Sequence, residues 1–174
     1  MNVFPAAGSI GMLARVELGE RFDPTHYVEC VEKGLAAAGF MQLNIRFVVE
    51  ALLAIGDLDR AEHHAEMLYR VIGGRLRQAL VGVAMGDVMQ RRGRLDRAYE
   101  AYDAARTFAE AIGARSSLVG ALIGLAEVAT ARGETPDARE IGRARRLCTE
   151  LGLGRAHARL RRLPMPASLV AVSS

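Results

Sequence analysis

The feature that most constrains the fold of this chain is the even spacing of its glycines. Eight of them are separated by 20, 17, 17, 20, 20, 20 and 19 residues, and they are Gly19, Gly39, Gly56, Gly73, Gly93, Gly113, Gly133 and Gly152. Glycine often stands just past the end of a helix, because it adopts the left-handed conformation there without steric penalty. The spacing therefore predicts a series of helices of about four turns each that end at these glycines.

Apolar residues recur at steps of three and four between the glycines. In residues 93–113 the series is Ala98, Ala101, Tyr102, Ala105, Phe108 and Ala109, which places one apolar stripe on the predicted helix. Aromatic residues make up only 5% of the chain and Trp is absent, so the core must consist of small and aliphatic side chains at close spacing. Because such side chains suit helix-on-helix packing, an all-α fold is expected.

Polar residues before the apolar stripes predict where helices begin. Asp57 is expected to cap the helix that follows it, and Thr135 to cap a helix whose first residue is Pro136. Ser116 or Ser117 is expected to open the helix that ends near Arg132.

The short connections between these helices predict antiparallel neighbours. The chain then reads as four helix hairpins at about residues 8–39, 41–73, 75–113 and 115–152, followed by a short basic helix at about 154–163. We expect one domain over residues 1–163 and a tail over 164–174, since 174 residues suit a single domain.

One helix start is written twice. The segment GRLDRA at 93–98 follows GDLDRA at 56–61 after 37 residues. A hairpin of two amphipathic helices cannot bury its apolar face alone, whereas stacked hairpins bury a continuous core between neighbours. The repetition therefore indicates a repeat array.

These residues resemble the tetratricopeptide repeat. Counted from Gly93, Gly86 matches the small position of the first helix, residues 93–96 the turn, and Ala98, Tyr102 and Ala105 the second helix. The same offsets from Gly56 give Val49, Ala61, Ala65 and Leu68; those from Gly133 give Ala126 and Ala138, with departures at Gly142 and Arg145.

The resemblance implies a right-handed α-solenoid of about four antiparallel helix hairpins plus a short C-terminal helix. The first helix of each hairpin would line a concave face. Repeats of this length are similar to those of bacterial regulators of the maltose-activator type and of multidomain nucleotide cyclases. The chain would then be the interaction part without an output domain.

Acidic residues recur at one step of three predicted first helices. Glu50, Asp87 and Glu127 each lie six residues before their turn glycine. The resemblance implies that this position faces the concave surface, together with Arg46, Gln90, Arg91 and Thr130. A row of carboxylates there would hold a basic or extended peptide through charge-assisted hydrogen bonds. The alternative is a set of solvated residues, with Asp87 and Arg91 forming an exposed pair.

Arginine dominates residues 139–162, which hold eight arginines and two glutamates. This segment predicts either a solvated face or a basic rim for an acidic partner, made of Arg143, Arg146, Arg155, Arg159 and Arg162. Nucleic acid is a weaker expectation, because no aromatic residue is present there to stack on a base and the net charge of the chain is only +3.

No motif in the sequence predicts catalysis, a cofactor or a metal. His63 and Glu66 lack a third ligand, and the histidines at 63 and 64 are expected at the surface. His26 and Cys30 lack the other groups of a nucleophilic site. The sequence contains no phosphate-binding glycine loop. Two pairs of glycines four residues apart, at 82 and 86 and at 120 and 124, are expected to let helices approach closely.

The function expected from the sequence is a non-catalytic scaffold that binds a protein or peptide on the concave face. A ligand-sensing regulatory domain is the alternative, and a nucleic-acid adaptor is a weaker one. A homodimer is plausible. The longest stretch of low charge contains Glu127 and is too short for a membrane span, and no export signal is evident. A cytoplasmic location is therefore expected.

Overall fold

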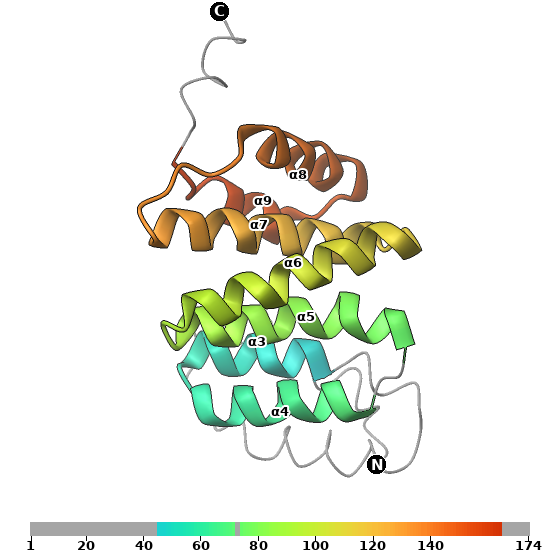
Figure 1. Ribbon diagram of the computed structural model, residues 1–174, viewed down its shortest axis with the longest axis vertical. Coiled ribbons are helices and arrows are strands. Elements are labelled where there is room, and N and C mark those ends of the chain that lie inside the picture. Colours follow the sequence, from blue (N-terminus) through green and yellow to red (C-terminus); the bar gives the residue numbers. More distant parts are fainter. Residues whose placement is uncertain (1–44, 72–73, 165–174) are drawn as a thin grey trace, which may run out of the picture. The chain divides into compact units, whose positions relative to one another are not determined.

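The computed structural model describes residues 45–71 and 74–164 (Figure 1), and these residues form seven α-helices and no β-strand. The helices are α3 (Ile45–Ile55), α4 (Leu58–Val71), α5 (Gly74–Arg91), α6 (Leu95–Ile112), α7 (Arg115–Ala131), α8 (Ala138–Leu151) and α9 (Gly154–Leu160). The prediction of an all-α chain is confirmed for this part of the sequence. The hairpin predicted at residues 8–39 and the tail from residue 165 lie outside the described residues.

The chain divides into two compact units, Met1–Arg77 and Gln78–Ser174, and the boundary falls within α5. In the first unit α3 packs on α4. The residues buried there include Val48 and Leu52 of α3 and Ala61, Ala65 and Leu68 of α4. The intervals of three and four residues are those of one helix face.

In the second unit α6 packs on α7, α7 packs on α8, and α9 lies against both α7 and α8 (Figure 1). The predicted stripe on α6 is observed, because Ala98, Tyr102, Ala105 and Ala109 are its buried residues. The larger core cluster takes side chains from α7, α8 and α9, among them Leu122, Ile123, Ile141, Cys148 and Leu160. Burial of Leu160 holds the short α9 on its neighbours.

Glycine ends the helices at the predicted positions wherever the structure describes them. Gly56, Gly93, Gly113, Gly133 and Gly152 all have positive φ, between 65° and 84°. At Gly113, φ is 70° and the N–H groups of the last turn bond back to Ala109 and Glu110, a geometry that glycine adopts without strain. The glycine spacing thus predicted these helix ends correctly.

Helix starts were predicted less well. Asp57 caps α4 as expected, since its carboxylate accepts the N–H of Arg60 at 3.2 Å. The cap of α8, however, is Asp137 rather than Thr135: its carboxylate accepts the N–H groups of Arg139 at 2.8 Å and Glu140 at 3.4 Å. A carboxylate also interacts more favourably than a hydroxyl with the positive end of a helix.

Two further boundaries differ from the prediction. The start of α7 is at Arg115, with Ala114 in the cap position, so neither Ser116 nor Ser117 opens it. Ser117 instead lies inside the helix and is 1% exposed. The last helix ends at Leu160, three residues before the predicted end.

Candidate functional site

Five polar side chains from four helices of the second unit meet in one hydrogen-bonded group, which we name the Arg159 cluster. It consists of Asp87 and Gln90 of α5, Tyr102 of α6, Glu127 of α7 and Arg159 of α9. The members are up to 72 residues apart in the sequence. The packing of α5, α6, α7 and α9 therefore assembles this site.

The guanidinium of Arg159 joins the two carboxylates. Its Nε donates to Oε1 of Glu127 at 2.9 Å, and its Nη2 donates to Oε2 of Glu127 at 2.6 Å and to Oδ1 of Asp87 at 3.0 Å. The two bonds to Glu127 form the bidentate arrangement that fixes both the position and the plane of a guanidinium. Arg159 is thus held in one orientation.

Tyr102 supports this arrangement from below. Its side chain is fully buried, and its hydroxyl lies 2.7 Å from Oδ1 of Asp87 and 2.9 Å from the Gln90 carboxamide oxygen. A phenol has one proton, and the shorter distance and the negative charge favour its donation to Asp87. Turning the Gln90 carboxamide would let its nitrogen donate to the phenol oxygen.

Two glycines make room for the Tyr102 ring. A Cβ at Gly86 of α5 would lie 2.5 Å from the ring, and a Cβ at Gly124 of α7 would overlap it as well. Gly82 serves the close approach that was expected, because a Cβ there would lie 2.8 Å from the carbonyl oxygen of Ala101. The ring therefore occupies a slot that side chains larger than hydrogen would close.

The environment of the cluster changes the protonation equilibria of two members. Burial, and then the charge of Asp87, raises the pKa of Tyr102 well above 10.0, so the phenol stays neutral. For Arg159, burial by itself lowers the pKa, but the charge of Asp87 and the hydrogen bond and charge of Glu127 outweigh it and the pKa is raised. The guanidinium is therefore permanently charged.

The cluster is open to solvent on one side. The side chain of Arg159 is 34% exposed, that of Asp87 15% and that of Glu127 21%. One cation and two carboxylates give the group a formal charge of −1. An exposed and rigid set of donors and acceptors of this kind can bind a ligand through hydrogen bonds with little loss of side-chain entropy.

The structure brings together some of the predicted concave-face residues. Asp87, Gln90 and Glu127 meet in the cluster. Arg91 and Thr130 are exposed nearby in the sequence, and the Thr130 hydroxyl donates to the carbonyl of Ala126 in its own helix at 2.9 Å. The alternative pairing of Asp87 with Arg91 is wrong, because Asp87 pairs with Arg159.

Two other predicted residues of that face, Arg46 and Glu50, lie on α3 in the first unit. Glu50 is partly exposed there. The acidic row is therefore described as a joined group only for its two members in the second unit.

The predicted basic rim does not form one set. Arg159 belongs to the cluster, where it meets carboxylates that the sequence assigned to another surface. Arg146, Arg155 and Arg162 are exposed. Arg143 is partly exposed and pairs with Glu110.

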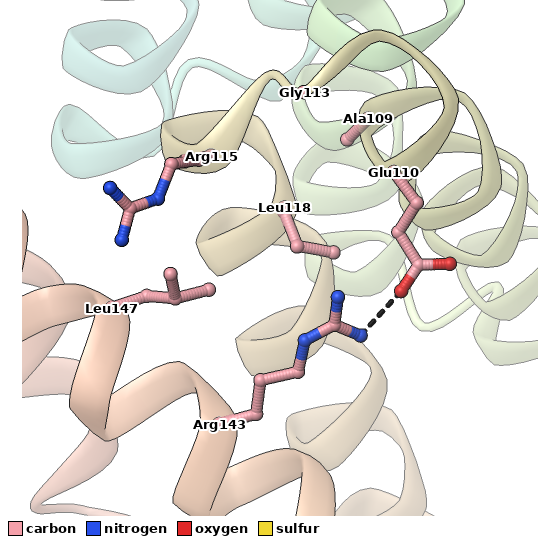
Figure 2. Close-up of a pocket in the computed structure, with 7 residues that line it drawn as sticks. All are labelled: Ala109, Glu110, Gly113, Arg115, Leu118, Arg143 and Leu147. Carbon is pink, nitrogen blue, oxygen red and sulfur yellow. Dashed lines mark hydrogen bonds and ion pairs between the residues drawn. The ribbon is translucent and has the colours of Figure 1, made fainter.

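A pocket of about 230 Å³ lies beside Arg143. Figure 2 shows Arg143 and Arg115 at its sides, with Leu118 and Leu147 between them. Both arginines already have acidic partners, because Arg143 pairs with Glu110 (dashed in Figure 2) and Arg115 pairs with Glu150. The charges around this pocket are therefore balanced, which gives it no preference for an anion.

The histidine pair on α4 differs from the expectation. His63 is exposed, but His64 is 1% exposed and is part of the buried face, so the prediction of two surface histidines is wrong for His64. The described residues contain no group of three or more His, Cys, Asp or Glu side chains that could hold a metal ion. Cys148 is buried and free, and burial raises the pKa of its thiol.

Sequence reasoning missed two parts of this site. Tyr102 was treated only as an apolar residue of a second helix, and Arg159 only as a member of a surface patch. A usable signal was present in Gly86 and Gly124, because glycines on two helices that flank an aromatic position indicate a ring inserted between them. No comparable local signal linked Arg159 to Asp87.

No model of a known protein family, no curated protein and no solved structure matches this chain. The helices in residues 45–71 and 74–164 include none that combines the length and the apolar character needed to cross a membrane. The case for a function therefore depends on the geometry of the cluster and on the resemblance of the repeats.

Proposed function

We propose that this chain is a non-catalytic interaction module of the tetratricopeptide type that binds a peptide segment of a protein partner. In this proposal α3–α4, α5–α6 and α7–α8 are antiparallel hairpins of a right-handed solenoid. The face lined by α5 and α7 carries the binding site, and the Arg159 cluster lies at its centre.

One observation carries the proposal. Asp87 and Glu127 stand at equivalent steps of two predicted first helices, six residues before Gly93 and Gly133, and both contact the same guanidinium. Equivalent positions on successive repeats that point into a common space are what a repeat protein needs to bind an extended segment. The length of the connections α5–α6 and α7–α8 and the glycines within them also support hairpins of the proposed kind.

The chemistry of the cluster favours binding over catalysis. Its tyrosine is buried and its pKa is raised, its arginine stays charged, and both groups are held by hydrogen bonds to other members. Catalytic acids and bases need a pKa near the working pH. The polar groups are instead suited to fixed hydrogen bonds with a ligand.

Photo-crosslinking with two matched variants tests the proposal. A peptide that binds the chain is first selected from a random display library. A photoreactive benzoylphenylalanine then replaces Arg91, which is exposed at the end of α5, or Arg97, which is exposed on α6. The proposal expects the peptide to crosslink to the variant at 91 and not to the variant at 97. Crosslinking at 97 alone, or equally at both positions, would show that the face lined by α5 is not the binding face.

A further inference from the structure

The internal hydrogen bonds of the Arg159 cluster leave one donor and one acceptor unused. Arg159 spends Nε and Nη2 on Glu127 and Asp87, and no bond within the described part of the chain uses its Nη1. Asp87 accepts from Tyr102 and Arg159 at Oδ1, and its Oδ2 likewise has no partner among the described residues. A guanidinium has five N–H donors and a carboxylate about four acceptor sites, so both groups retain capacity.

These two atoms face solvent. Neither Nη1 of Arg159 nor Oδ2 of Asp87 is among the buried polar atoms of the described residues that lack a partner. The side chains that carry them are 34% and 15% exposed. An external group can therefore reach both atoms.

The unused donor and acceptor are neighbours. Nη1 and Nη2 share one carbon of the guanidinium, Oδ1 and Oδ2 share one carbon of the carboxylate, and Nη2 lies 3.0 Å from Oδ1. The bidentate contact with Glu127 fixes the guanidinium plane, and the Tyr102 hydroxyl holds the Asp87 carboxylate. The pair is thus set in place before a ligand arrives.

The charges of the cluster decide which ligand suits this pair. A cation beside Asp87 would meet the fixed positive charge of Arg159, and an anion beside Arg159 would meet the two carboxylates. An uncharged amide meets neither repulsion, because its carbonyl accepts from Nη1 while its N–H donates to Oδ2. Both hydrogen bonds involve a charged protein group, which makes them stronger than bonds between neutral groups.

We propose that Arg159 and Asp87 together bind one uncharged amide group of the partner segment. The amide is either the carboxamide of an Asn or Gln side chain or a main-chain peptide group, which offer the same donor and acceptor. This inference rests on the proposed function, since it names the chemistry that the binding face reads. It replaces the expected preference for a basic peptide, because Arg159 supplies that positive charge internally.

The test uses the full chain and four blocked tripeptides that differ only in the central residue, which is Gly, Gln, Lys or Glu. The side-chain N–H signals of Arg159 are followed by NMR during titration with each tripeptide and are assigned with an Arg159→Lys variant. A shift that saturates with the Gln peptide alone supports recognition of a side-chain carboxamide. Equal shifts with all four peptides support recognition of the main chain.

Two results would overturn the inference. One is tighter binding of the Lys or Glu peptide than of the Gly and Gln peptides, which would mean that the site reads charge. The other is no shift of the Arg159 signals with any of the four peptides. If the display-selected peptide still crosslinks at position 91 in that case, the amide inference fails while the interaction function stands.

A pair of Asp→Asn variants provides the control. Asp87→Asn offers an N–H where the ligand needs an acceptor, so binding of the effective tripeptide should weaken by about tenfold, as expected for loss of one hydrogen bond to a charged group. Asp96→Asn changes a carboxylate on α6 that is 94% exposed and pairs with Arg132, and it should leave binding unchanged. Equal binding by wild type and Asp87→Asn would contradict the role of Oδ2.

Discussion

Arg159 on α9 binds Glu127 on α7 through two hydrogen bonds, from Nε to Oε1 at 2.9 Å and from Nη2 to Oε2 at 2.6 Å. The contact joins a seven-residue helix to the second unit by a polar anchor in addition to the buried Leu160. It also places a cation beside two partly buried carboxylates, Asp87 and Glu127, which would otherwise repel each other. Arg159 is therefore important both for the stability of this unit and for the shape of the proposed site.

Replacing Arg159 by Ala should lower the free energy of unfolding by about 1–3 kcal/mol. This is less than the loss of a fully buried ion pair, because about a third of the side chain is exposed to solvent. Arg159→Lys should fall between the two, since an ammonium cannot form the bidentate contact. Urea denaturation measures the change, with Arg161→Ala, at an exposed neighbour, as the control. Equal losses in Arg159→Ala and Arg161→Ala would mean that the cluster adds no stability.

Gly124→Ala should destabilise the protein by about 1–3 kcal/mol, the usual result of overpacking a core. The added methyl group would overlap the Tyr102 ring, which helices α5 and α7 hold from both sides. Gly142→Ala is the matched control: the new Cβ would meet only Nη1 of Arg146, at 3.7 Å, so gain of helix propensity should stabilise α8 by roughly 0.5–1 kcal/mol. Thermal unfolding of the two variants should therefore shift in opposite directions. A rise in melting temperature for Gly124→Ala would show that the slot is wider than described.

The buried phenol of Tyr102 should make the protein less stable in alkali. Burial and the charge of Asp87 hold its folded-state pKa well above 10.0, so the unfolded chain loses this proton at a lower pH than the folded chain does. The contribution is complete below pH 10 and decreases as the pH rises from there towards the folded-state pKa, by about 1.4 kcal/mol per pH unit. Urea denaturation from pH 8 upwards should show a steeper decline in wild type than in Tyr102→Phe. Parallel declines would contradict the raised pKa.

Asp137→Ala should destabilise the protein by about 0.5–2 kcal/mol, because two N–H groups at the start of α8 would lose their acceptor. Thr135→Ala should have little effect, since Thr135 is exposed and lies before the cap. Thermal unfolding of the two variants distinguishes the observed cap from the predicted one. A larger loss in Thr135→Ala would favour the prediction from sequence.

Helix ends could be predicted from the sequence because glycine at a helix terminus acts through local backbone geometry. Gly93 and Gly113 mark the observed ends of α5 and α6 for this reason. Helix starts were harder, because several residues near one start can act as the cap. Near residue 137 a carboxylate competed with a hydroxyl two residues earlier, and the carboxylate caps the helix.

The cluster could be predicted only in part. The regular spacing of Asp87 and Glu127 correctly indicated residues that lie close together, but Arg159 is 72 and 32 residues away from them. Such a contact depends on how α9 packs on α7 and α8, and the local pattern around Arg159 contains only a series of arginines. The role of the Tyr102 hydroxyl was missed because its position in the apolar stripe concerns the ring and not the oxygen.

The most direct test of the proposed binding face is the affinity of the display-selected peptide for three forms of the chain, measured by isothermal titration calorimetry. The account predicts that Asp87→Asn binds the peptide about tenfold or more weakly than wild type does, and that Asp96→Asn binds it equally well. Equal dissociation constants for wild type and Asp87→Asn, with both proteins folded, would contradict the claim that the Arg159 cluster binds the partner.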